Sequence, residues 1–157
     1  MNLPSILLAG FSATIVLTTI IAVGQGFGFT RISIPFLVGT IFTPARDRAM
    51  VVGTALHFLN GLVFALFYAL LFERLGRATW WIGGGLGFVH AIFVLTIGMA
   101  VLPGLHPNMV SEYFGPTPNR LLQPPGFLAL NYGRGTPVVT LVAHVIYGAI
   151  VGAMYKL

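Results

Sequence analysis

Four long apolar stretches, separated by shorter polar or proline-rich segments, dominate the pattern of residues along the chain. They lie near residues 5–24, 49–72, 80–102 and 137–155. A helix needs about 20 predominantly apolar residues to cross roughly 30 Å of hydrocarbon, and each stretch is long enough. The pattern therefore predicts an all-α membrane protein whose four transmembrane helices form a single domain over residues 1–157.

The segments that connect these predicted helices differ in length. The turn at 73–79 is short, whereas the connections at 25–48 and 103–136 are long. Each long connection contains an apolar piece, ISIPFLVGTIF or FLALNY, that is too short to span and is expected to pack on the bundle. We therefore expect two long capping loops on one face of the membrane, called face B. Both termini then lie on the opposite face, called face A.

Composition leads to the same class of protein. The chain is 57% hydrophobic and 7% charged, whereas soluble domains carry about 25% charged residues. It has no cysteine, which excludes disulfides, thiolate nucleophiles and cysteine-ligated metals. The net charge of +5 is spread over short loops, so no nucleic-acid partner is expected. Neither Lys nor Arg precedes Arg31, as a signal peptide would require, so the first stretch is expected to be a retained span.

The second and fourth stretches resemble each other. When His57 is aligned with His144, VVGTALHFLNGLVFALFY (51–68) lies over VVTLVAHVIYGAIVGAMY (138–155) without a gap. The glycine four residues after each histidine also matches. This indicates a duplicated helical hairpin, with its copies related by a pseudo-two-fold axis along the membrane normal. Chance similarity between apolar segments is the alternative.

Three of the four histidines fall inside predicted spans. A rise of about 1.5 Å per residue places His57 roughly 12 Å, His144 about 10 Å and His90 about 18 Å from face B. His106, in LPGLHP, is expected at the face-B surface. Similar depth does not show whether the three rings are close together laterally.

Small and polar residues share the helical faces that carry these histidines. Asn60 lies three residues after His57, and Tyr147 lies three residues after His144. Glycines at four-residue spacing on the same faces let helices approach closely. Because lipid offers imidazole no hydrogen bond, we expect the rings to point toward neighbouring helices. Asn60, Tyr147 and His106 are expected to be structural polar residues.

Three roles for the histidines remain open. In the first, neutral rings form hydrogen bonds across helix interfaces and hold the bundle together. In the second, His57 and His144 bind haem, or His57, His90 and His144 bind a metal ion, in an electron-transfer or sensor subunit. No nearby carboxylate would support such ligands. In the third, the histidines line the path of a small transporter or channel, although the three acidic residues lie at span ends or in loops.

Other residues give weaker signals. Trp80 and Trp81, together with Tyr68 and Tyr155, are expected to mark the face-A interface. Asp47 is expected either to pair with a neighbouring arginine or to sit favourably at a helix N-terminus. No arrangement of Ser, His and acidic residues suggests a hydrolase, so an enzyme is not expected.

Several motifs in this order resemble an uncharacterised family of small bacterial four-span integral membrane proteins. They are PFLVGTIFTPARDRAMVVG, HFLNG, LPGLHPNM, PPGFLALNYG and TPVVTLVAHVIYGAIVG. The resemblance implies a four-helix architecture and a multi-pass protein of the bacterial inner membrane, but no chemistry. With the glycine-lined faces, it favours a non-catalytic accessory or scaffold protein that contacts the lipid bilayer and associates with itself or with other membrane subunits.

Overall fold

The computed structural model describes residues 1–111 and 122–157, and every regular element in these two parts is a helix. Part of the second predicted capping loop, residues 112–121, lies outside the described residues. Within the described parts, four helices are long and apolar enough to cross a membrane: Leu3–Gly26, Arg46–Leu75, Trp80–Leu105 and Thr136–Met154. The four predicted spans are therefore confirmed as helices of suitable length and composition, with ends that differ by a few residues.

The helices follow local sequence signals. Helix α1 (Leu3–Gly26) begins where the Asn2 side chain accepts a hydrogen bond from the backbone N–H of Ser5. Helix α3 (Arg46–Leu75) ends at Gly76, whose φ of 64° suits a residue without a Cβ atom. Helix α6 (Thr136–Met154) has a proline in its first turn, where the missing N–H costs no intrahelical bond.

The third span is continuous but not uniformly α-helical. Helix α4 (Trp80–Phe93) passes through a π-helical turn (Val94–Gly98) into α5 (Met99–Leu105). The helix extends a little past the predicted end near residue 102, through Pro103 to Leu105. The proline has no backbone N–H, so the hydrogen bond to the carbonyl four residues before it is absent.

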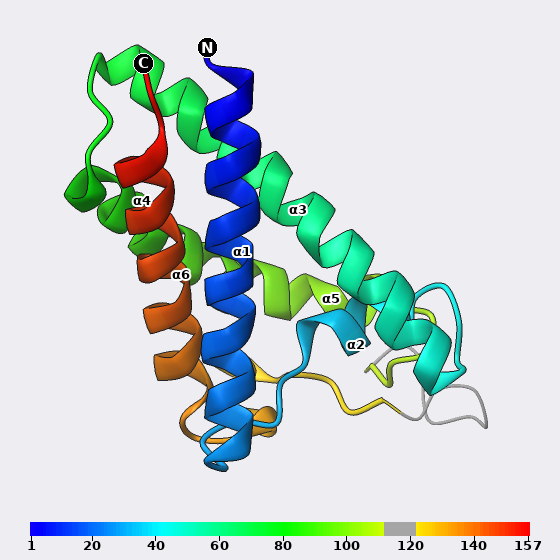
Figure 1. The fold of residues 1–157 in the computed structure, drawn as a ribbon. Coiled ribbons are helices and arrows are strands. Elements are labelled where there is room, and N and C mark those ends of the chain that lie inside the picture. The colour runs from blue at the N-terminus through cyan, green and yellow to red at the C-terminus, as the bar shows by residue number, and fades with distance from the viewer. Residues whose placement is uncertain (112–121) are drawn as a thin grey trace.

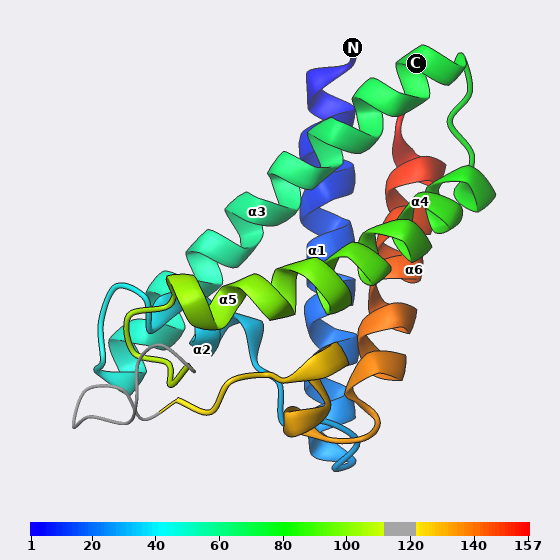
Figure 2. The same ribbon diagram turned by 180° about the vertical axis from the view of Figure 1, so that it is seen from behind.

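Two helices stand upright against each other and two are inclined to them. Helices α1 and α6 run side by side in opposite directions, while α3 and the α4–α5 span cross them at an angle (Figures 1 and 2). Helix α3 has 30 residues, or about 45 Å at 1.5 Å per residue. A helix longer than the hydrocarbon thickness is expected to tilt, and α3 is inclined accordingly.

Glycines bring α4 and α6 into backbone contact. A Cβ atom at Gly83 would collide with the carbonyl group of Gly148, and one at Gly87 would collide with that of His144. The reverse also holds, because a Cβ atom at Gly148 would collide with the carbonyl of Gly83. The glycine-lined faces therefore permit the close approach that the sequence predicts.

The end of the bundle opposite the termini is covered by short elements. Helix α2 (Ile34–Gly39) packs on the first turns of α3, where Gly53 lies against the carbonyl group of Pro35. The segment FLALNY forms a 3₁₀-helical piece (Phe127–Tyr132), in which Leu128 and Ala129 have φ of 52° and 59°. Both apolar pieces of the long connections are thus short and pack on the bundle.

His106 belongs to this cap and is not at its surface. Its side chain is 3% exposed, so it lies at the expected end of the bundle but is buried within the cap. Its Nδ1 accepts from the backbone N–H of Asn108, and its Nε2 donates to the Leu37 carbonyl at 2.9 Å. Asn108 donates to the Thr40 carbonyl at 2.5 Å. The motif LPGLHPNM therefore satisfies the carbonyl groups at the end of α2, which is a structural role.

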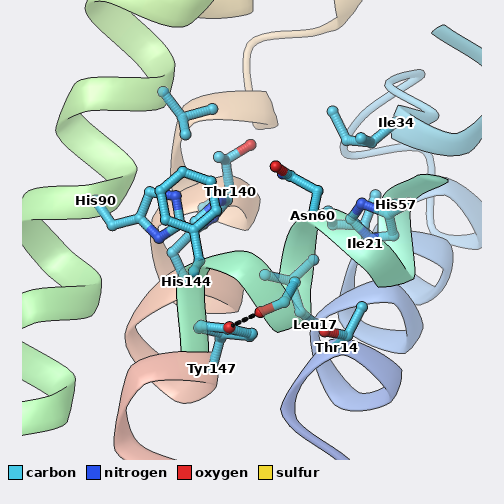
Figure 3. Close-up of a pocket in the computed structure, with 13 residues that line it drawn as sticks. Thr14, Leu17, Ile21, Ile34, His57, Asn60, His90, Thr140, His144 and Tyr147 are labelled. Atoms are coloured by element: carbon cyan, nitrogen blue, oxygen red, sulfur yellow. Dashed lines mark hydrogen bonds between the residues drawn. The ribbon is translucent and has the colours of Figure 1, made fainter. Parts of the chain in front are cut away.

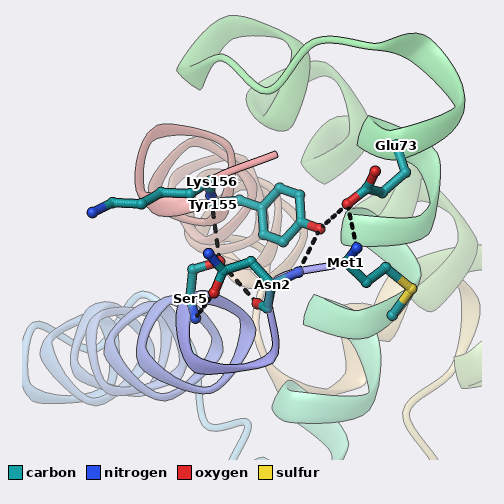
Figure 4. A network of polar contacts seen from close by, with 6 residues as sticks. All are labelled: Met1, Asn2, Ser5, Glu73, Tyr155 and Lys156. Carbon is teal, nitrogen blue, oxygen red and sulfur yellow. Dashed lines mark hydrogen bonds and ion pairs between the residues drawn. The ribbon is translucent and has the colours of Figure 1, made fainter.

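Polar contacts at the opposite end join both chain termini to the end of α3 (Figure 4). The Met1 ammonium group lies 3.0 Å from a carboxylate oxygen of Glu73, and the Tyr155 hydroxyl donates to the same oxygen at 2.6 Å. This hydrogen bond and partial burial raise the pKa of Tyr155, with burial the larger cause. Trp80 and Trp81 are exposed at this end, 66% and 57% respectively, in agreement with an interfacial position.

Two weaker expectations have different outcomes. Tyr68 is 4% exposed and its hydroxyl lies beside His90 inside the bundle, so its assignment to the interface was wrong. Tyr155 is also buried, at 5% exposed, but its hydroxyl bonds Glu73 at the expected end of the bundle. Asp47 makes no ion pair among the described residues and lies in the first turn of α3, as the helix N-terminus alternative requires.

The predicted repeat has a counterpart in the packing. Gly61 lies against Thr14 of the preceding long helix, and Gly148 lies against Gly83 of its own preceding helix. The aligned glycines thus occupy comparable contact points. The duplication itself stays a prediction.

Candidate functional site

One cavity inside the bundle brings the three intramembrane histidines together. His57 from α3, His90 from α4 and His144 from α6 all line a space of about 100 Å³ (Figure 3). The expectation that these side chains turn inward agrees with this arrangement. The remaining lining residues come from all four spans and from α2: Thr14, Leu17, Ile21, Ile34, Asn60, Gly61, Phe64, Val94, Thr140 and Tyr147.

His57 connects α3 to α1 through one of its two ring nitrogens. Its Nε2 lies 3.1 Å from Oγ1 of Thr18, and the Thr18 hydroxyl donates to the Thr14 carbonyl at 2.7 Å. Because that hydroxyl proton is already used, Thr18 accepts from Nε2–H, and Nδ1 of the neutral ring carries a lone pair. That Nδ1 is buried and has no hydrogen-bond partner among the described residues.

His90 fills the boundary between α3 and α4. Its Nδ1 lies 3.3 Å from the Tyr68 hydroxyl, and its ring centroid is 3.9 Å from that of Phe64. On its other side, the His144 ring meets it edge-on at a centroid distance of 4.8 Å. One imidazole therefore contacts side chains of two other spans.

His144 and Tyr147 complete the wall formed by α6. Nδ1 of His144 donates to the Thr140 carbonyl at 2.8 Å, which leaves Nε2 with a lone pair. The Tyr147 hydroxyl donates to the Gly61 carbonyl of α3 at 2.5 Å. The structural role predicted for Tyr147 therefore has direct support. The Thr140 hydroxyl is buried, and its oxygen has no partner among the described residues.

Asn60 differs from the role expected for it. It lines the cavity, but it is exposed and makes no hydrogen bond within the parts of the chain that are described. It therefore does not link helices, and instead marks where the cavity reaches the surface of α3.

The residues of the cavity do not fit a metal ion. No group of three or more His, Asp or Glu side chains in residues 1–111 and 122–157 is placed to hold one. Of the six ring nitrogens, one contacts Thr18, one Tyr68 and one the Thr140 carbonyl. The geometry gives no support to the three-histidine site.

Haem does not fit either. Pockets that enclose drug-sized ligands have volumes of about 300–1,000 Å³, whereas this cavity measures about 100 Å³. His90 also occupies the space beside His144 that a macrocycle would need. A haem bound by His57 and His144 would require the helices to separate.

Several residues of the site were not expected from the sequence. Tyr68, Phe64 and Thr18 make the contacts that position His57 and His90. Helical periodicity contained part of this signal, because Phe64 and Tyr68 follow His57 by seven and eleven residues and so share its face. The sequence does not indicate with which side chains of other helices these residues pair.

Comparison with known proteins adds no further information about this site. No family model, curated protein or solved structure matches the chain.

Proposed function

We propose that this protein is a non-catalytic accessory or scaffold subunit of a larger membrane assembly. It is a helical bundle whose intramembrane histidines hold the spans together. The observation that supports this is that each of these histidines contacts a side chain of another helix: His57 contacts Thr18, and His90 contacts both Tyr68 and His144. All three rings therefore make contacts that stabilise the bundle.

The inclined helices offer surface for partners. Only 28% of the most apolar window of α3 and 22% of that of the α4–α5 span are buried, compared with 39% for α1 and for α6. The apolar faces left uncovered can contact lipid or another membrane subunit. The resemblance described above supports the bacterial inner membrane as the location.

The size of the native particle tests this proposal. The chain is extracted from its native membrane into lipid nanodiscs, and the mass of the protein released from the lipid is measured by native mass spectrometry. We expect a discrete assembly heavier than the 16.8 kDa monomer. A population consisting only of monomers would contradict the proposal.

A pair of variants makes the test specific. Val89→Trp alters a residue of α4 that is 64% exposed, and Leu8→Trp alters one of α1 that is 61% exposed. We expect Val89→Trp to dissociate the assembly and Leu8→Trp to leave it intact. If both variants dissociate the assembly, or if neither does, the inclined helices do not provide the interface. Transport stays a prediction, which protein-dependent flux in liposomes would favour.

A further inference from the structure

Some polar groups at the cavity have no hydrogen-bond partner in the described parts of the protein. Two residues that line it, His57 and Thr140, each carry a buried polar atom, Nδ1 and Oγ1 respectively, that has no partner among the described residues. The side chains that carry them are only 8% and 3% exposed. Buried polar groups in folded proteins are nearly always paired, and each exception calls for an explanation such as an unseen guest.

The direction of the missing hydrogen bonds identifies the chemistry of the guest. Nδ1 of His57 carries a lone pair because Nε2–H donates to Thr18. Nε2 of His144 carries one because Nδ1–H donates to the Thr140 carbonyl. The buried Nδ1 of His57 has no donor, so a hydroxyl group of a guest satisfies it and a ketone or an ether does not. The Thr140 hydroxyl can donate to the same guest.

Size and surroundings indicate the rest of the guest. An engineered apolar cavity of about 150 Å³ binds benzene, and this space of about 100 Å³ is smaller but partly open to the surface. Phe64, His90 and Tyr147 are aromatic residues of its lining, and aromatic rings pack well against another ring. A single six-membered aromatic ring therefore suits the space.

The cavity reaches the surface from inside the membrane. Asn60 lines it and is exposed. This residue lies 14 positions after the start of α3 at Arg46, or about 21 Å along the helix axis. A guest that enters beside Asn60 comes from the hydrocarbon layer and must be soluble in lipid.

We propose that this cavity binds the hydroxyl-bearing ring of a membrane-soluble phenol or quinol, which donates to the free nitrogen of His57 and contacts the Thr140 hydroxyl. This goes beyond the proposed scaffold role, because a scaffold subunit needs no guest. Binding can be measured in the isolated bundle, so its failure is distinct from a failure to assemble.

The test uses the whole chain in lipid nanodiscs with ¹⁵N-labelled histidine rings. The probe is 4-propylphenol, and its matched control is 4-propylanisole, in which a methyl group replaces the donated proton. The Nδ1 signal of His57 is assigned by its loss in His57→Gln. We expect the phenol to shift this signal saturably and the anisole to leave it unchanged. Equal shifts with both compounds would overturn the proposal, as would a shift that does not saturate.

Substitutions in and outside the cavity test where the phenol binds. Thr140→Val keeps the shape of the side chain and removes its hydroxyl, and we expect about fivefold weaker phenol binding. Ile34→Phe enlarges an apolar side chain of the lining and removes no polar group, and we expect it to abolish the saturable shift. Thr96→Val and Ile97→Phe are the matched controls, since both residues lie outside the cavity. If Thr140→Val does not fold, Ile34→Phe decides the question.

Two further outcomes would reject the assignment. Undiminished phenol binding in Ile34→Phe would place the probe elsewhere. A His57 Nδ1 signal that already shows an accepted hydrogen bond without probe, and does not move when phenol is added, would mean that the cavity holds only water.

Discussion

Two contacts between helices of the bundle differ in how closely the backbones approach. Between α4 and α6, glycines bring the backbones together, and Gly83 and Gly148 leave no room for a side chain. Between α3 and α4, aromatic rings fill the boundary, with His90 lying between Phe64 and His144. Backbone contact leaves no space, whereas packing through large rings leaves a cavity in which polar groups gather. The candidate binding site therefore lies beside the contact between α3 and α4.

The largest effect is expected at the glycine contact. In Gly148→Val, the new side chain meets the Gly83 carbonyl, which belongs to the backbone and cannot move aside. We expect a loss of about 3 kcal/mol in the free energy of unfolding, near the upper end for overpacking. The measurement is helix content by circular dichroism as mixed micelles become richer in denaturing detergent.

Gly85→Val is the matched control for this prediction. A Cβ atom at Gly85 meets nothing within 4 Å, so its effect is expected to stay within about 0.5 kcal/mol. Similar losses in both variants would mean that the backbone contact at Gly148 does not govern this interface.

Removal of the ring at the second contact should have the next largest effect. His90→Ala loses the ring contacts with Phe64 and His144 and the hydrogen bond with Tyr68. We expect a loss of about 2 kcal/mol in the same unfolding measurement. Phe88→Ala removes a ring that is 49% exposed on the same helix and should cost less. If the two substitutions cost the same, His90 does not bridge the helices.

A smaller effect should follow from the loss of one hydroxyl beside the cavity. Tyr147→Phe keeps the ring and removes only the hydrogen bond to the Gly61 carbonyl. Hydrogen bonds between membrane helices contribute about 0.6–2 kcal/mol, so we expect a loss of about 1 kcal/mol. An unchanged unfolding curve would show that this bond does not link α6 to α3.

The cap lies outside both helix contacts, and its contribution to stability is expected to depend on pH. Burial raises the pKa of Tyr132 from 10.0 to about 12, and its hydroxyl donates to the Gln123 carbonyl at 2.7 Å. A folded pKa above the unfolded one gives stability that is present below pH 10 and lost as pH rises through about 12. Tyr132→Phe should therefore lose less stability than the wild type over this interval. Parallel unfolding curves across that range would contradict this.

The sequence was informative about each helix separately. Hydropathy located the four spans, because about 20 apolar residues are needed to cross the hydrocarbon. Glycine spacing identified the close-packed faces, and depth along the axis placed His57, His90 and His144 in the face-B half of the bundle. These properties belong to one helix at a time and can be counted along the chain.

Relations between helices could not be read in the same way. Periodicity gives the face of Tyr68 but not the helix opposite it, so its bond to His90 was missed. His106 lies in an irregular segment where no period applies, and its burial depends on the end of α2 meeting its ring. The π-helical turn at Val94–Gly98 also left no sequence signal that set it apart.

The most direct test of the account measures the contact between the His90 and His144 rings in lipid bilayers. The chain contains four histidines, so solid-state NMR with labelled histidine gives few signals, and His90→Ala identifies the relevant one. The account predicts a ring-to-ring contact that matches the centroid distance of 4.8 Å. Rings that show contacts with lipid acyl chains and none with each other would contradict it.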